Sequence, residues 1–231
     1  MAEVNKADTI SKYCLVFSKR GALKFLGHLD FMRAVQKTVR RSMLPVSYSR
    51  GYNPHMLLSF ALPLPLGMEA SADYAELVLE GPAEGALLAE SLNACAPEGL
   101  IFFGAGKMAE GSPSLAAEVS SAGYVFNAGE PALNKEIEEA VGWMMGEQSI
   151  IVNKKTKRGE AAADVRRDVI SVESRGDGIV FMRLSAGGRA HLNPELVADL
   201  IKNRSGATRA RSAVMTRTGL YKSDGSALFI P

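Results

Sequence analysis

The chain has 231 residues, of which 47% are hydrophobic and 23% charged, a composition typical of a globular protein with one large or two small domains. No stretch approaches 18 consecutive apolar residues, and the polar N-terminus lacks the apolar core of a secretory signal, so neither a membrane span nor secretion is expected. The two cysteines, Cys14 and Cys95, lie in apolar contexts, which indicates buried thiols and predicts a cytoplasmic protein.

The net charge of +2 is the sum of three sequence blocks whose charges alternate in sign. Residues 1–64 carry +7, residues 65–149 carry −12, and residues 150–231 carry +7. If the two basic blocks meet in the fold, they form a surface suited to a polyanion. The alternative is that the charges scatter over a solvated surface, and the sequence leaves both interpretations open.

The first half of the chain predicts the element order β-α-β-β-α-β. Strands are expected at residues 13–17, 56–62, 74–80 and 100–104. A helix is predicted from His28 or Leu29 to about Met43, because apolar residues recur at steps of three and four and Pro45 ends the pattern. The residues predicted to form its inward stripe are Leu29, Met32, Val35, Val39 and Met43. A second helix over residues 84–96 is expected to direct inward Leu87, Leu88, Leu92 and Cys95.

The same order is expected again after a weakly patterned connection at residues 105–120. Strands are predicted at 124–127, 149–153, 165–174 and 178–184, a helix at 131–145, and a basic loop at 154–164. Asn193 is predicted to cap a further helix whose first residue is Pro194. A last strand at 211–217 is expected to pair with 227–230.

The predicted fold is therefore α+β, with two tandem ferredoxin-like (βαββαβ) units, each an antiparallel sheet with helices on one face. Residues 1–104 form the first unit, with the basic helix and a Gly-Tyr-Asn-Pro-His loop; residues 105–120 connect it to the second unit, residues 121–231.

Basic side chains interleaved with tyrosines are the main functional signal. Lys and Arg neutralise phosphates, and tyrosines stack on unpaired bases, so this pattern predicts RNA binding. In the first basic block the predicted nucleic-acid-binding residues are Lys19, Lys24, Arg33, Lys37, Arg40, Arg41, Tyr48, Arg50, Tyr52, Asn53 and His55. In the second they are Lys154, Lys155, Arg158, Arg166 and Arg167. The alternative is a solvated helix face and a charged loop.

The histidines are too far apart in sequence to form a local metal motif, so no metal site is expected. His28 and His55 are the candidates for acid–base chemistry, which with neighbouring cations would serve metal-independent RNA cleavage. No catalytic residue is assigned, because the sequence does not show that these groups converge. The apolar run at residues 62–68 offers a third interpretation, a surface that docks another protein.

Three motifs identify a family resemblance. The segments F-S-K-R-G-A-L-K-F-L-G-H-L-D-F-M-R, R-R-S-M-L-P-V-S-Y-S-R-G-Y-N-P-H and L-S-F-A-L-P-L-P-L-G-M-E-A follow one another over residues 17–70. They resemble the radical-SAM-linked family of unknown function, whose members are fused to, or encoded beside, B12-type radical SAM proteins. In that family the loop usually reads G-F-N-P-H, so Tyr52 is a departure.

The resemblance implies a partner rather than a reaction. A radical SAM cluster needs three closely spaced cysteines, whereas this chain has two that are 81 residues apart. The iron–sulfur cluster, S-adenosylmethionine and, in B12-type members, cobalamin would then belong to the partner, and this chain is expected to bind no cofactor. The resemblance also implies a link to RNA processing. The leading hypothesis is thus a non-catalytic accessory protein that presents an RNA, such as a tRNA or rRNA, to a radical SAM protein.

Overall fold

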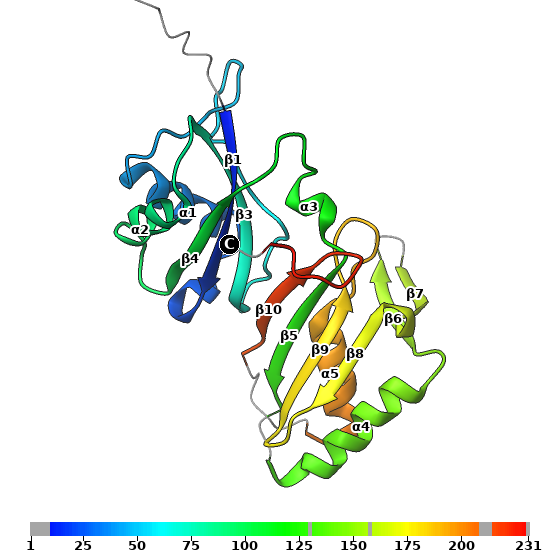
Figure 1. The fold of residues 1–231 in the computed structure, drawn as a ribbon. Coiled ribbons are helices and arrows are strands. Elements are labelled where there is room, and N and C mark those ends of the chain that lie inside the picture. Colours follow the sequence, from blue (N-terminus) through cyan, green and yellow to red (C-terminus); the bar gives the residue numbers. More distant parts are fainter. Residues whose placement is uncertain (1–9, 129–130, 157–158, 208–213, 230–231) are drawn as a thin grey trace, which may run out of the picture. The chain divides into compact units, whose positions relative to one another are not determined.

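The computed structural model describes residues 10–128, 131–156, 159–207 and 214–229. They form a mixed α+β fold in which the described strand pairings are antiparallel (Figure 1). The chain divides into two compact units. Unit 1 comprises Met1–Glu118 and Ala227–Pro231, and unit 2 comprises Val119–Ser226.

Unit 1 has the order β-α-β-β-α-β that the sequence predicts. Its elements are β1 (Ile10–Lys19), the short 3-10 helix η1 (Gly21–Phe25), α1 (His28–Arg41), β2 (Leu58–Phe60), β3 (Glu69–Glu80), α2 (Gly85–Asn93), β4 (Leu100–Lys107) and α3 (Leu115–Glu118). Its strands are ordered β4-β1-β3-β2. The expected connection at 105–120 therefore contains the end of β4 and the short helix α3.

The core of unit 1 lies between one face of this sheet and the helices α1 and α2. Alternate residues of β1, namely Tyr13, Leu15 and Phe17, belong to the same buried cluster as α1 and α2 side chains. The Phe17 ring lies 5.8 Å from the Phe31 ring and 5.6 Å from the Phe60 ring. This aromatic packing positions α1 on the sheet.

The buried stripe of α1 differs from the predicted one. Phe31, Val35, Thr38 and Val39 are buried, whereas Leu29 is 68% and Met43 87% exposed. The helix is rotated so that Phe31 reaches the aromatic core, and this rotation turns Leu29 outward. Met43 lies beyond the last helical residue, in a left-handed conformation with φ 55°. In α2 the prediction for Leu87 is likewise wrong, since Leu87 is 57% exposed and Ala89 is buried.

Unit 2 combines a four-stranded sheet with a separate hairpin. Its elements are β5 (Ser121–Asn127), η2 (Pro131–Leu133), α4 (Asn134–Gly146), β6 (Ile151–Thr156), β7 (Gly159–Asp164), η3 (Arg166–Asp168), β8 (Val169–Ser174), β9 (Ile179–Ser185), α5 (Pro194–Ser205) and β10 (Thr216–Tyr221). The sheet order is β10-β5-β9-β8, and β6 pairs with β7. The region predicted as a basic loop, residues 154–164, is thus mostly a β-hairpin.

Two predictions about helix α5 and the chain end have different outcomes. The Asn193 side chain accepts a hydrogen bond from Glu195 N at 3.0 Å, which confirms the predicted cap. The end of the chain, expected to complete the second half, belongs to unit 1 instead: an added Cβ on Gly106 of β4 would lie 2.3 Å from the Phe229 ring. Part of the predicted strand at 211–217 lies outside the described residues.

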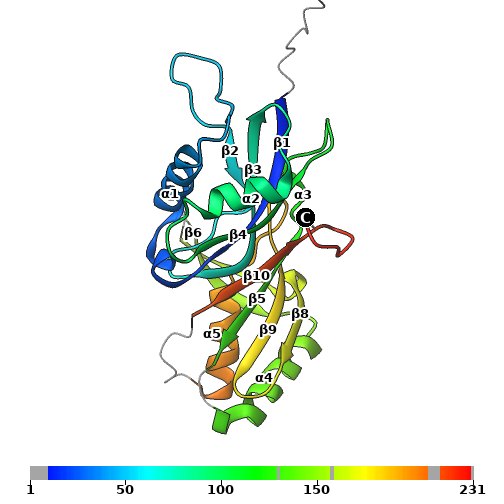
Figure 2. The same cartoon turned by 60° about the vertical axis from the view of Figure 1, so that its left-hand side comes forward.

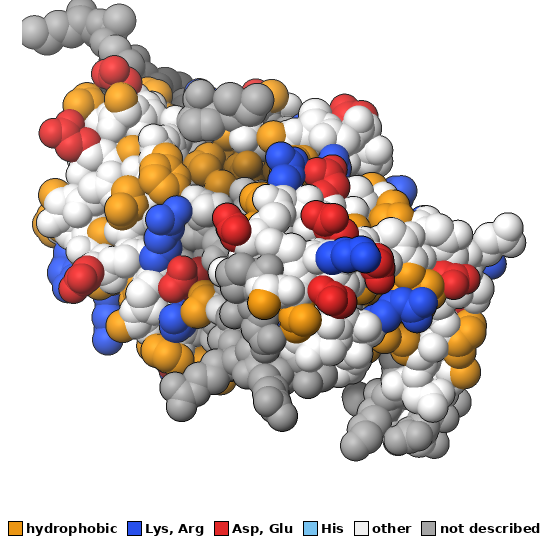
Figure 3. Space-filling view, turned by 90° about the horizontal axis from the view of Figure 1, so that it is seen from below, with side chains coloured by type: hydrophobic (Ala, Val, Ile, Leu, Met, Phe, Trp, Pro, Cys, Tyr) orange, Lys and Arg blue, Asp and Glu red, His pale blue; other side chains and the backbone are white. Residues whose placement is uncertain are grey.

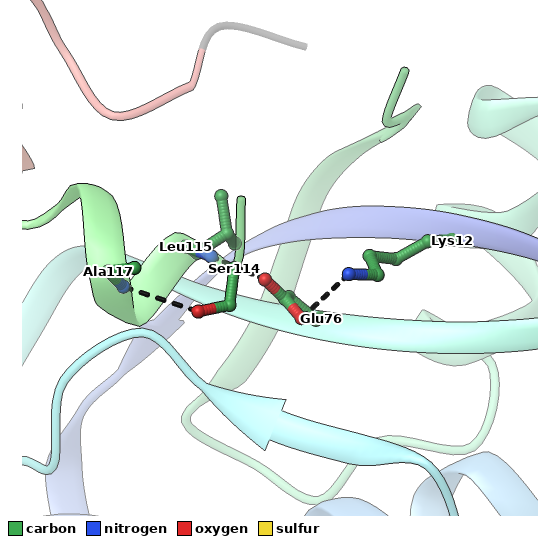
Figure 4. Close-up of polar contacts among 5 residues, drawn as sticks. All are labelled: Lys12, Glu76, Ser114, Leu115 and Ala117. Atoms are coloured by element: carbon green, nitrogen blue, oxygen red, sulfur yellow. Dashed lines mark hydrogen bonds and ion pairs between the residues drawn. The ribbon is translucent and has the colours of Figure 1, made fainter. Parts of the chain in front are cut away.

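A buried carboxylate ties α3 to the sheet of unit 1. Glu76 of β3 accepts a hydrogen bond from Leu115 N, and its other oxygen lies 3.6 Å from Lys12 Nζ of β1 (Figure 4). Ala117 N donates to Ser114 Oγ at 3.3 Å and closes the first turn of α3. One charged side chain therefore links the start of α3 to strands β3 and β1.

Candidate functional site

Two of the sequence motifs meet in unit 1 through Glu69. Its carboxylate accepts a hydrogen bond from Gly21 N at 3.1 Å and lies 3.7 Å from Lys24 Nζ. Gly67 N donates to Lys24 O at 2.8 Å. The R-G-A-L-K and L-P-L-G-M-E segments, more than 40 residues apart in sequence, are therefore neighbours at the start of α1.

The basic face of α1 consists of Arg33, Lys37, Arg40 and Arg41, all of which are exposed as predicted. Arg33 Nη1 lies 2.9 Å from Asp30 Oδ1, so part of its charge is neutralised. Within the described residues no acidic side chain forms an ion pair with the other three. These three cations are therefore available to a polyanion.

The Gly-Tyr-Asn-Pro-His loop follows α1 and extends beyond β2 (Figure 2). Ser49 closes its base: His55 N donates to Ser49 Oγ at 3.0 Å, and the same oxygen lies 2.8 Å from His55 Nδ1. Tyr48 is 42% exposed and Tyr52 fully exposed, and Arg50, Asn53 and His55 are exposed as well. The Ser49–His55 contacts therefore close the loop at its ends, and the Tyr52 side chain between them is exposed to solvent.

The two candidate acid–base histidines have structural contacts. His28 begins α1, and its ring packs edge-on against Phe60 at 5.7 Å. His55 uses Nδ1 to close the loop with Ser49. No contact between His28 and His55 is found among the described residues. The contacts of His28 with Phe60 and of His55 with Ser49 indicate structural roles, in packing and in loop closure.

Lys19 and Lys24 are less available than the sequence indicates. Lys19 is fully buried, its Nζ donates to Leu26 O at 2.9 Å, and it lies 4.9 Å from the Phe31 ring centroid. Because its ammonium is inside unit 1, Lys19 is not a surface residue and is removed from the candidate interface. Lys24 is half-buried and engaged by Glu69.

The second basic segment belongs to unit 2, and only part of it faces solvent. Arg166 is held by three main-chain carbonyls: Nε donates to Glu147 O, Nη1 to Val169 O and Nη2 to Met145 O, at 2.9, 2.9 and 3.1 Å. This guanidinium caps the end of α4, so Arg166 is a structural residue, whereas Arg167 is exposed. Lys154 and Lys155 lie on β6, and Arg158 lies outside the described residues.

On the face shown in Figure 3, blue Lys and Arg side chains are interspersed with red Asp and Glu side chains. That face is therefore not a uniform basic surface.

Three exposed apolar side chains lie around the start of α1 and are named here the apolar corner, and two of them, Phe25 and Leu29, were not predicted from the sequence. Phe25 is 69%, Leu29 68% and Leu66 63% exposed. The apolar run at 62–68 indicated Leu66, but the helical period had assigned Leu29 to the core. The apolar corner lies in the neighbouring segments that Glu69 and Gly67 hold together.

The remaining chemistry of the described residues is limited. Burial, with a smaller contribution from the Glu76 charge, raises the pKa of the Cys14 thiol to about 12, so this cysteine is not a nucleophile at neutral pH. No group of three His, Cys, Asp or Glu side chains with metal-binding geometry is found in the described part of the chain. Nor does any helix described there have the length and apolarity needed to cross a membrane.

Comparison with known proteins places the chain in a family. The model of the family described as "Uncharacterized protein conserved in bacteria (DUF2344)" matches residues 12–194. No curated protein matches the chain. Because the matched residues make up more than half of the sequence, the chain belongs to this bacterial family.

Proposed function

We propose that the protein is a cytoplasmic accessory protein that binds an RNA, such as a tRNA or rRNA, and presents it to a separate radical SAM enzyme. In this proposal the iron–sulfur cluster, S-adenosylmethionine and cobalamin belong to the partner. We also propose that both units are ferredoxin-like. The matching strand orders, β4-β1-β3-β2 and β10-β5-β9-β8, support this, with the β6–β7 hairpin inserted into unit 2.

The observation that carries the RNA proposal is the basic face of α1. Lys37, Arg40 and Arg41 are exposed and have no acidic partner among the described residues. The loop that follows this helix exposes Tyr52 and Arg50. Cations that contact phosphates beside an aromatic ring that contacts a base are the usual combination at single-stranded RNA sites.

Salt dependence tests this proposal. Each phosphate contact to a single strand adds about 0.7 to the slope of log affinity against log salt. Three contacts then correspond to roughly a twentyfold loss of affinity between 50 and 200 mM salt. Replacing Lys37, Arg40 and Arg41 with Ala should weaken binding of a single-stranded RNA and reduce the slope by about 2. Fluorescence anisotropy at several salt concentrations measures both quantities.

A matched control removes the same charge elsewhere. Lys107, Lys135 and Arg189 are exposed cations outside α1, and their triple Ala variant has the same net charge as the α1 variant. It should bind like the unmodified protein. Equal weakening by both variants would show that only net charge matters, and a slope near zero for the unmodified protein would refute phosphate-driven binding.

The apolar corner supports a second surface, for the protein partner. Phe25, Leu29 and Leu66 expose large side chains in segments that are hydrogen-bonded to one another. Charge introduced by Leu66→Asp should abolish copurification with the radical SAM protein while RNA affinity stays unchanged. If RNA binding is absent and the complex nevertheless forms, the chain is a protein-docking module.

A copurification with and without nuclease separates the alternatives. Recovery of the radical SAM protein in both samples, with RNA only in the untreated one, is the expected result. Metal-independent cleavage of the bound RNA that is lost in His28→Ala or His55→Ala would instead support an endonuclease.

A further inference from the structure

The helices of unit 2 leave one face of its sheet open. On β5 the residues Ala122, Tyr124 and Phe126 are buried, and on β9 so are Val180, Met182 and Leu184. Lys202 of α5 lies 5.7 Å from the Phe126 ring, which places this alternate set on the helix side. In Figure 1, α5 lies behind β5 and β9.

The opposite face carries a different set of side chains. Residues paired across neighbouring strands project from the same side of a sheet. Arg183 is paired with Gly123 of β5 and Ser171 of β8, and Phe181 is paired with Glu173. Tyr221 of β10 is paired with Ser121. Two aromatic rings and a guanidinium thus share the open face, and Phe181 is 38% exposed.

A hollow of about 190 Å³ lies on this face, lined by residues that include Gly123, Arg175, Phe181, Arg183, Thr218 and Tyr221. A larger residue at Gly123 would crowd this hollow, because a Cβ there would lie 2.6 Å from Thr218 Oγ1 and 3.3 Å from the Tyr221 ring. Because Gly123 pairs with Gly219, two adjacent positions of the sheet have no side chain. The rings and guanidinium groups therefore surround a shallow hollow that suits a flat ligand.

The guanidinium of Arg183 is fixed in place. Its Nε donates to Ser121 Oγ at 3.0 Å, its Nη2 donates to Gly225 O at 3.3 Å, and it lies 4.0 Å from the Tyr221 ring centroid. Arg175 lies 5.3 Å from the Phe181 ring and 2.9 Å from Glu173 Oε2. The face thus presents one guanidinium held by several contacts, a second guanidinium paired with Glu173, and the exposed Phe181 ring.

We infer that the open face of the unit 2 sheet, defined by Arg175, Phe181, Arg183 and Tyr221 and named here the sheet platform, stacks unpaired bases of single-stranded RNA. The inference rests on the proposed RNA-binding function and names a second site for it. A four-stranded sheet whose aromatic side chains stack two or three bases is an established way to bind single strands, and arginine planes stack on bases as well.

The charge balance predicts how this site differs from α1. Glu173 neutralises Arg175, and Arg183 is then the one platform cation without an ion pair among the described residues, so the sheet platform releases fewer counterions than the three cations of α1 when it binds. Base stacking is sequence-tolerant, because every base has a π-face. Binding at the sheet platform should therefore depend on salt less than binding at α1, and the stacking of a base on Phe181 should contribute affinity that salt hardly changes.

The test measures the affinity of the full chain for a fluorescein-labelled single-stranded oligoribonucleotide of about ten nucleotides, at 50 and 200 mM salt. Phe181→Ala should weaken binding about tenfold at both salt concentrations, without changing the salt slope. The control is Ile170→Ala, which removes a 48% exposed apolar side chain from the same sheet outside the hollow and should change affinity less than twofold. Circular dichroism checks that both variants fold.

A second measurement uses the unmodified protein, so it does not depend on the folding of a variant. Photocrosslinking to an oligoribonucleotide with 5-iodouridine should attach the base to Phe181 or Tyr221, as mapped by mass spectrometry. If Phe181→Ala binds normally and crosslinks fall elsewhere while the α1 triple variant is weakened, the platform is wrong and the proposed function stands. If the unmodified protein binds no RNA, both fail. If Phe181→Ala no longer copurifies with the protein partner but binds RNA with unchanged affinity, the sheet platform docks a protein and the inference is overturned.

Discussion

Removal of the Glu76 carboxylate is expected to loosen α3 and destabilise unit 1. The side chain of Glu76 is 10% exposed, and its two oxygens serve Leu115 N and Lys12 Nζ. Leu115 is buried, so its N–H would have no access to water if the acceptor were lost. A hydrogen bond to a charged group contributes about 1.5–3 kcal/mol. The pair with Lys12 adds about 0.5 kcal/mol at most, because the lysine side chain is 36% exposed.

These contributions predict that Glu76→Ala lowers the free energy of unfolding by about 3 kcal/mol. Glu76→Gln keeps an oxygen acceptor but loses the charge, which about halves the hydrogen-bond energy, so a loss of roughly 1 kcal/mol is expected. Lys12→Ala should have an effect of about 0.5 kcal/mol or less.

Urea titration measures the free energies, and native-state hydrogen exchange locates the change. In Glu76→Ala the Leu115 amide should exchange faster by a larger factor than the amides of β1. Glu80→Gln is the control, since Glu80 is an exposed carboxylate on the same strand. A free energy of unfolding of Glu76→Ala within about 0.5 kcal/mol of that of the unmodified protein, or an equal effect of Lys12→Ala, would refute this role of the carboxylate.

Three further predictions concern a thiol, a carboxyl and a helix end. Cys14, with its pKa raised to about 12, should resist iodoacetamide at pH 8 until the protein unfolds, whereas partly exposed Cys95 should react first; rapid native labelling of both would contradict this. Hydrogen bonds from Ile150 N and Arg166 N lower the pKa of Asp164 below its ordinary 3.8. The Asp164 carboxylate thus contributes fully to the free energy of unfolding above about pH 4, and this contribution is lost as pH falls through the lower pKa of the folded state. The free energies of unfolding of Asp164→Asn and of the unmodified protein should therefore converge in acid. Met43→Gly should stabilise by about 0.5–1 kcal/mol, because its left-handed backbone favours glycine, whereas Lys37→Gly inside α1 should destabilise by about 1 kcal/mol; urea titration compares them.

The sequence determined the local elements of this protein well. Helix α1 begins at His28, one of the two starts predicted, and the Asn193–Pro194 pair begins α5, because capping and helical period are properties of neighbouring residues. The same period identified Arg33, Lys37, Arg40 and Arg41 as one exposed face. Polar residues opposite an apolar stripe are exposed in almost any packing, so this part of the candidate site could be predicted.

Only the tertiary structure decided which charged side chains are exposed and free to contact a ligand. Lys19 and Arg166 look like surface cations in sequence. Lys19 is enclosed beside Phe31, and Arg166 donates to three main-chain carbonyls, two of them on the distant residues Met145 and Glu147. The sheet platform also depends on tertiary structure, because strand alternation puts Phe181 and Arg183 on one side but does not say which strands lie beside them. Strand order and the positions of helices come from contacts between distant residues. These contacts bring Gly123 beside Arg183 and leave that face open.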